Sequence, residues 1–120
     1  MIKGIGMDLT EISRIERSIS KSERLAERVL TAKELQLYRE MEPKRRLEFL
    51  AGRFAAKEAF AKAAGTGIGK AVGFQDIEIL PEDFGAPKIY AAGYERERIF
   101  VSITHTEHYA AAQVVIEEPV

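Results

Sequence analysis

The fold of this chain is decided by the stretch Arg53-Phe54-Ala55-Ala56-Lys57-Glu58-Ala59-Phe60-Ala61-Lys62-Ala63-Ala64-Gly65-Thr66-Gly67, which is typical of the second half of one long helix. Pro43 suits the first turn of that helix, where its missing N–H is not needed, and Gly65 suits a left-handed C-terminal cap. At about 100° per residue, apolar side chains between them fall on two opposite faces. The sequence therefore predicts a long helix that is covered on two sides.

Glu58 and Lys62 carry charge on one of these apolar faces. An isolated buried carboxylate is strongly unfavourable, so Glu58 needs a lysine, a hydrogen-bond donor, a proton or a bound cation. One alternative is an exposed ion pair with Lys62, four residues further on, which would stabilise the helix by about 0.2–0.5 kcal/mol. The flanking alanines and the Gly-Thr-Gly after the helix favour a functional role for Glu58.

Residues 2–9 alternate in the manner of a strand, with apolar side chains on one face and Gly4, Gly6 and Asp8 on the other. Glycines inside a strand mark a close approach by another backbone or by a ligand. We therefore expect Asp8 at the end of a strip left open for a neighbour. The alternative is that Asp8 is a polar cap for the next helix, and the pattern alone leaves both open.

The remaining segments divide into helices first and strands later. Residues 10–20 predict a helix, and Thr31 with Glu34 forms a capping box that opens another. Strands are predicted at residues 74–80, 88–91, 100–104 and 110–116, the last two joined by a hairpin around residues 106–109. This order predicts an α+β fold in which a mostly antiparallel sheet packs against the long helix.

Composition narrows the class of protein. The 120 residues suit one domain spanning 1–120, and a net charge of −1 argues against general nucleic-acid binding. Cysteine is absent, so disulfides and thiolate metal sites are excluded and any metal is expected to be a hard one. The early charges at the N-terminus argue against a signal peptide, and the lack of a long apolar run argues against a membrane span. We therefore expect a cytoplasmic location.

Three segments together resemble a known family. They are the helical stretch quoted above, Gly6-Met7-Asp8-Leu9 near the start, and Val101-Ser102-Ile103-Thr104-His105-Thr106 near the end. In this order and spacing they are similar to the holo-acyl-carrier-protein synthases, the short single-domain branch of the phosphopantetheinyl transferases. The resemblance covers nearly the whole chain. It implies a 4′-phosphopantetheinyl transferase-like fold and transfer of 4′-phosphopantetheine from coenzyme A to a serine of apo-acyl carrier protein, releasing adenosine 3′,5′-bisphosphate, in fatty acid biosynthesis.

The resemblance also implies roles for single residues. Asp8 and Glu58 match the family's ligands for Mg²⁺, and Lys62 is similar to its active-site lysine, which assists the departing phosphate. For removal of the serine proton we choose Glu58, acting directly or through a metal-bound water. The residues that resemble contacts to coenzyme A are Lys44, Arg53 and His105.

Basic side chains predict a docking surface for the acidic carrier protein. The candidates are Arg14, Arg24 and Arg45, extended by Arg17 and Arg28. Interleaved glutamates allow the alternative that this is an ordinary solvated face.

The family's quaternary structure implies a homotrimer with active sites between subunits. A function from another class also remains: a non-catalytic module that docks an acidic protein through these helices, with Glu58 and Lys62 as a structural pair.

Overall fold

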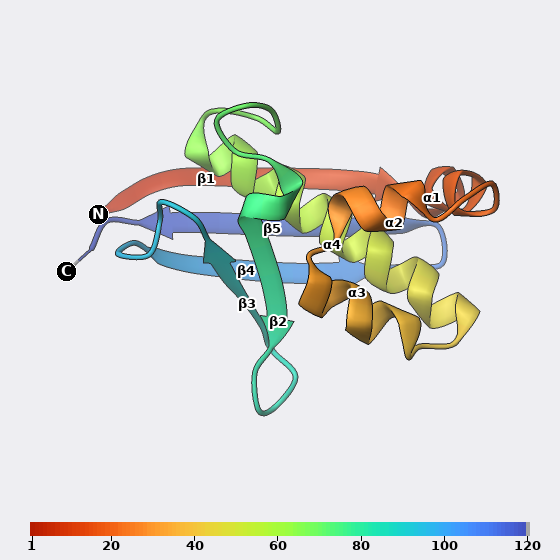
Figure 1. Cartoon of the computed structure of the whole chain (residues 1–120). Coiled ribbons are helices and arrows are strands. Elements are labelled where there is room, and N and C mark those ends of the chain that lie inside the picture. Colours follow the sequence, from red (N-terminus) through yellow and green to blue (C-terminus); the bar gives the residue numbers. More distant parts are fainter. Residues whose placement is uncertain (120) are drawn as a thin grey trace.

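The elements of the chain follow one another in the predicted order, helices before most strands. The computed structural model describes residues 1–119. Its elements are β1 (Ile2–Glu11), α1 (Ile12–Ile19), α2 (Arg24–Val29), α3 (Ala32–Arg39), α4 (Pro43–Ala64), a 3-10 turn (Phe74–Asp76), β2 (Ile77–Pro81), β3 (Pro87–Ala91), β4 (Arg98–His105) and β5 (Tyr109–Glu117). Helix α4 lies across the strands, and α1, α2 and α3 gather around its first half (Figure 1).

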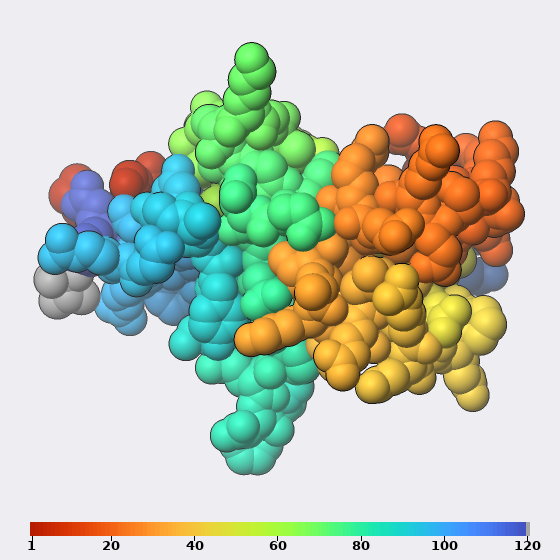
Figure 2. Space-filling view, viewed as in Figure 1, coloured from red at the N-terminus to blue at the C-terminus, as the bar shows by residue number. Residues whose placement is uncertain are grey.

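All strand pairs are antiparallel, which confirms the predicted α+β class. They form two sheets rather than one: a three-stranded sheet in the order β1-β5-β4, and a hairpin of β2 and β3. Strands β3 and β4 diverge, so the hairpin leaves the plane of the larger sheet. In the space-filling view its tip protrudes on one side of the molecule and the loop after α4 on the other (Figure 2).

Helix α4 has the boundaries that the sequence predicts. Pro43 occupies its first turn, and Gly65 ends it with a φ of 84°, in the left-handed region that favours glycine. The helix is buried on two sides, against the larger sheet on one and against α1–α3 and the β2–β3 hairpin on the other. No helix within residues 1–119 is both long and apolar enough to cross a membrane.

The glycines of β1 let that strand lie directly on the backbone of α4. A Cβ on Gly6 would stand 2.0 Å from the carbonyl oxygen of Ala59, and one on Gly4 would stand 1.9 Å from that of Ala63. Both distances are impossible for real atoms, so only glycine permits this packing. The expected neighbour of the glycine strip is therefore α4 of the same chain.

Of the element boundaries that differ from the prediction, two have a clear local reason. Thr10 continues β1 by pairing with Ala110 of β5, so α1 begins at Ile12 and not at residue 10. Residues 74–76 form a 3-10 turn instead of the first part of a strand. The Asp76 carboxylate accepts a hydrogen bond from the backbone N–H of Gly73 at 2.8 Å, which favours the turn.

The start of α3 confirms the predicted capping box. Thr31 accepts a hydrogen bond from the Glu34 backbone, and Glu34 Oε1 accepts one from the Thr31 backbone at 2.8 Å. At the other end of α3, Arg46 donates to the carbonyl oxygens of Tyr38 and Arg39, at 3.1 and 2.6 Å. One cation from the first turn of α4 therefore caps the preceding helix.

The far face of the larger sheet is apolar and exposed. Ile5, Met7 and Leu9 of β1 are 60%, 62% and 66% exposed. The register places Ile5 in one row with Val115 of β5 and Phe100 of β4, and Phe100 is half exposed. We call this the outer sheet face. Contiguous apolar surface of this kind usually marks an interaction site.

Candidate active site

The close contact between β1 and α4 brings Asp8 next to the last turns of the helix. Lys62 Nζ donates to Asp8 Oδ1 at 3.2 Å and to the Met7 carbonyl oxygen at 2.9 Å. Thr10 Oγ1 donates to the other oxygen, Asp8 Oδ2, at 3.0 Å. The helix cap of α1 is Glu11, so the alternative that Asp8 caps this helix is wrong. Both carboxylate oxygens of Asp8 are thus held by donors from this chain.

Glu58 is the second carboxylate of this site and is partly buried. Desolvation raises the pKa of Glu58, repulsion from the nearby Asp8 carboxylate raises it further, and Lys62 opposes both effects. The exposed Glu58–Lys62 ion pair considered from the sequence is not the one formed, because within residues 1–119 Lys62 pairs with Asp8. Glu58 therefore has a raised affinity for a proton or another cation.

The chemistry of the two carboxylates suits a hard divalent cation. Mg²⁺ is usually held by one or two carboxylates, while water and substrate phosphate supply the remaining oxygens. Asp8 and Glu58 provide two such ligands, and the part of the chain that the structure describes holds no cluster of three or more Asp, Glu, His or Cys side chains suited to a metal. The Asp8 side chain keeps 16% of its surface exposed, which leaves access from solvent.

A buried lysine beside Glu58 is the main feature that the sequence reasoning missed. Lys57 is fully buried, and its Nζ donates to the Val29 carbonyl oxygen at 2.6 Å, to Glu34 Oε1 at 2.6 Å and to the Phe74 carbonyl oxygen at 3.1 Å. The other oxygen of Glu34 accepts the backbone N–H of Ile79 at 2.6 Å. The three N–H donors of the ammonium therefore have three acceptors.

This buried pair fixes the rotation of α4 about its axis. Because successive helical residues differ by about 100°, holding Lys57 on the side of α2 and α3 turns Glu58 away from them. Desolvation lowers the pKa of Lys57, and the carboxylate of Glu34 works in the opposite direction. The sequence signal was Glu34 itself, because a carboxylate that is buried in a capping box needs a cation to balance its charge, and the oxygen that accepts the Thr31 N–H also accepts Lys57 Nζ.

Three of the residues expected to contact coenzyme A or the carrier line one cavity of about 330 Å³: Arg45, Arg53 and His105. The Arg53 guanidinium lies 4.2 Å from the centroid of the Phe49 ring, and its Nε donates to the Ile79 carbonyl oxygen at 3.2 Å. Desolvation lowers the pKa of Arg53 to about 10, which leaves it charged at neutral pH. The cavity thus contains fixed positive charge.

Lys44 lies beside a neighbouring cavity of about 510 Å³, which His105 also lines. Glu48 lies between the two cavities, with its Oε2 at 3.8 Å from His105 Nδ1. Along α4, at 1.5 Å per residue, Arg45 and Glu58 are about 20 Å apart. The predicted site residues therefore form two groups, one near each end of the helix.

The arginines predicted to dock a carrier are exposed. Arg14, Arg17 and Lys21 line a shallow cavity of about 370 Å³ along α1, and Arg24 begins α2. Arg45 stands at the start of α4, 3.8 Å from Glu48. The helical end of the molecule therefore carries much of its positive charge on the surface.

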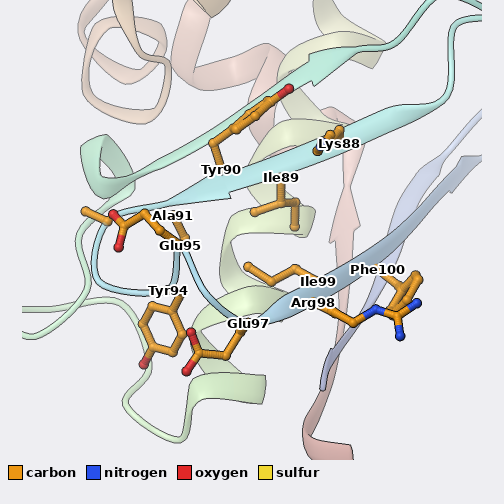
Figure 3. Close-up of a pocket in the computed structure, with 11 residues that line it drawn as sticks. Lys88, Ile89, Tyr90, Ala91, Tyr94, Glu95, Glu97, Arg98, Ile99 and Phe100 are labelled. Carbon is orange, nitrogen blue, oxygen red and sulfur yellow. The ribbon is translucent and has the colours of Figure 1, made fainter. Parts of the chain in front are cut away.

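A further cavity, of about 620 Å³, lies where β3 and β4 diverge. Lys88, Ile89 and Tyr90 come from β3, while Ile99 and Phe100 come from β4 (Figure 3). None of the residues predicted from the sequence as site residues lines it.

Comparisons with known proteins show the family and the fold of this chain. A sequence model of the 4′-phosphopantetheinyl transferase superfamily matches residues 4–115. Holo-[acyl-carrier-protein] synthases of Bacillus pumilus and Bacillus subtilis are 55% and 56% identical to the chain over 117 residues, covering 98% of it and 97% of each relative. A crystal structure of the Bacillus anthracis holo-(acyl-carrier-protein) synthase in complex with CoA (3′,5′-ADP) is 45% identical, has a TM-score of 0.91 and covers 98% of both chains.

Proposed function

The chain belongs to the 4′-phosphopantetheinyl transferase superfamily and transfers the 4′-phosphopantetheine group of coenzyme A to a serine of apo-acyl carrier protein, and we propose that Asp8, Glu58 and Lys62 perform this transfer. The observation that carries the proposal is the meeting of two carboxylates and an ammonium group where β1 crosses α4. A phosphoryl transfer needs charge neutralisation, a proton acceptor and stabilisation of the leaving group. These three side chains can meet those needs.

The metal in this proposal is Mg²⁺, held by Asp8 and Glu58. Two hard oxygen ligands, both partly exposed, support this choice. When bound, Mg²⁺ neutralises phosphate charge and orients the pyrophosphate for attack by the serine hydroxyl. Thr10 fixes one oxygen of Asp8 and so orients its carboxylate toward the site.

Glu58 is our candidate for the general base. Its raised pKa makes it a better proton acceptor at neutral pH than an ordinary carboxylate, which supports removal of the serine proton directly or through water. Lys62 would neutralise or protonate the departing phosphate oxygen. Its side chain is 52% exposed and long enough to follow that group.

Coenzyme A would be held by Lys44, Arg53 and His105. Arg53 supports this role because stacking on Phe49 and its bond to Ile79 hold its guanidinium in place, so less side-chain entropy is lost on binding a phosphate. The carrier protein would dock on Arg14, Arg24 and Arg45. Their exposure supports attraction of an acidic partner by a chain whose net charge is only −1.

We also propose a homotrimer with active sites between subunits. The glycine face of β1 is covered by α4 of the same chain, so the exposed apolar surface that supports association is the outer sheet face. The separation of the two groups of site residues along α4 supports a site completed by a neighbour. A sedimentation equilibrium mass equal to that of one chain at micromolar concentration would overturn this part. A cytoplasmic role in fatty acid biosynthesis belongs to the same proposal.

The test is the mass of an apo-acyl carrier protein after incubation with the protein, coenzyme A and Mg²⁺. We expect the addition of one phosphopantetheine, loss of this addition when EDTA replaces Mg²⁺, and loss with Glu58→Gln. The alternative of a non-catalytic docking module predicts an unchanged carrier mass under every condition. Modification that persists in EDTA would remove the metal from the mechanism and leave the transfer itself intact.

A further inference from the structure

We propose that Lys62 is an internal substitute for the metal, whose ammonium group holds the Asp8 carboxylate in the free protein and must leave it when a divalent cation binds. The inference rests on the proposed function, because it assumes a metal site at Asp8 and Glu58. Two events are then coupled: occupation of the site by a cation and release of Lys62 toward the phosphate.

The contacts of Asp8 show which of its oxygens a bound cation would compete for. Its two oxygens are held differently: Oδ2 by the neutral hydroxyl of Thr10 at 3.0 Å, and Oδ1 by the charged ammonium of Lys62 at 3.2 Å. A neutral hydroxyl can keep its bond while the carboxylate binds a cation. An ammonium at the same carboxylate is repelled by a divalent cation there, because both are positive and only a few ångströms would separate them. The Lys62 ammonium and a divalent cation would therefore compete for the same atom, Asp8 Oδ1.

The net charge of the cluster explains why Lys62 would leave Asp8 when a divalent cation binds. Asp8, Glu58 and Lys62 together hold one more negative than positive charge, and the carboxylates lie close enough to repel each other. Without a metal, Lys62 is the cation that relieves this repulsion. With a dication present the cluster becomes positive, and the ammonium gains by moving to an anion. The phosphate of the substrate is such an anion.

The exposure of the Lys62 side chain allows it to move away from Asp8. Its side chain is 52% exposed, and its second bond goes to the Met7 carbonyl oxygen at the edge of β1. It can therefore change rotamer without opening the core. Lys57, in contrast, is fully buried with three acceptors and has no exposed path. Of these two lysines, only Lys62 can exchange between Asp8 and a bound phosphate.

The test is a titration with Mn²⁺ alone, in which free Mn²⁺ is followed by electron paramagnetic resonance. Lys62→Met keeps the length of the side chain and removes its charge, so we expect Mn²⁺ affinity to rise at least about fivefold. The matched control is Lys33→Met on α3, an exposed lysine outside the site, which should leave the affinity within about twofold of the parent. Equal or weaker Mn²⁺ binding by Lys62→Met overturns the inference.

Asp8→Asn in the Lys62→Met background separates this inference from the metal site itself. If the double variant does not bind Mn²⁺ while Lys62→Met alone binds it like the parent, the metal site at Asp8 is supported and the proposed competition with Lys62 is wrong. If it leaves Mn²⁺ binding unchanged, the metal site at Asp8 is wrong as well.

A second measurement uses the unaltered protein. Acetic anhydride in small amount modifies lysines according to their exposure and freedom, and mass spectrometry reports each one. We expect Mg²⁺ to raise the acetylation of Lys62 several-fold relative to Lys33. An unchanged ratio at saturating Mg²⁺ means that Lys62 stays on Asp8, which contradicts the proposed release.

Discussion

Helix α4 presents the same chemical pair twice, in two different surroundings. Lys57 meets Glu34 at 2.6 Å with both side chains fully buried, whereas Lys62 meets Asp8 at 3.2 Å with 52% and 16% of the side chains exposed. The buried ammonium has three acceptors from three elements, and the exposed one has two acceptors from β1 alone. One lysine–carboxylate pair is thus part of the packed interior, whereas the other lies at the surface, where water can replace either partner.

The difference follows from desolvation. A buried pair is stable only while both partners and their hydrogen bonds are present, because either charge alone in the interior is strongly unfavourable. An exposed pair loses little when it opens, since water replaces the partner. Proximity in sequence therefore says little about whether a lysine in α4 is structural or mobile.

The largest effect is expected from breaking the buried pair. Lys57→Met leaves the Glu34 carboxylate uncompensated and should lower the free energy of unfolding by about 3–5 kcal/mol. The matched change at the exposed pair, Lys62→Met, should lower it by less than about 1 kcal/mol. Urea unfolding followed by circular dichroism measures both. Similar losses for the two variants would refute the contrast between the pairs.

The next effect concerns turnover rather than stability. Glu58→Gln keeps the size of the side chain but removes the anion, and we expect kcat to fall by about 100-fold or more while the fold is retained. Asp8→Asn should behave in the same way, and both should weaken the dependence of the rate on Mg²⁺. Steady-state transfer assays over a range of Mg²⁺ concentrations check this. Near-normal turnover in either variant would show that these carboxylates are not the metal ligands.

A smaller effect on catalysis is expected from Arg14, whose charge would act only by attracting the carrier protein. Arg14→Glu on the exposed side of α1 should raise the KM for the carrier by about tenfold, leave the KM for coenzyme A nearly unchanged and alter thermal stability little. Transfer assays at low and high salt supply the measurement, because a docking charge loses its effect as salt rises. A carrier KM and salt dependence equal to the parent's would make this an ordinary solvated face.

The smallest effect is a pH dependence in the metal-free protein. Because the pKa of Glu58 is raised on folding, the native state binds its proton more readily than the unfolded chain, and stability falls as pH rises from about 4.3 through the raised value. Glu58→Gln removes this loss and should stabilise the protein by less than about 1 kcal/mol at neutral pH. Unfolding in EDTA at neutral pH and near pH 4 should show the gain shrinking on acidification. A gain that is constant with pH would contradict it.

Local signals predicted the parts of the fold that depend on single residues. Pro43 and Gly65 mark the ends of α4, and Thr31 with Glu34 marks the start of α3, because caps act through their own backbone neighbours. The glycine face of β1 predicted a close backbone approach. It did not identify α4 as the partner, since that depends on the packing of segments more than fifty residues apart.

The site was predicted unevenly for a similar reason. Family resemblance named Asp8, Glu58 and Lys62, and the structure brings them together. Helix geometry suggested Lys62 as a partner for Glu58, but β1 supplies a better acceptor. Lys57 was missed because nothing in the spacing of α4 shows that Glu34 lies against it.

The ladder between β1 and β5 has a consequence for the synthesis of this protein. It joins Ile2 to Glu117 and Thr10 to Ala110, so the strand that carries Asp8 finds its partner only near the end of the sequence. While the ribosome is still adding those residues, at about 5–20 per second, α4 is already made but β1 lacks the strand that holds it in the sheet. A nascent chain truncated before β5 would therefore lack the sheet that supports Asp8, and its alanine-rich helix would be an early target for chaperones and proteases.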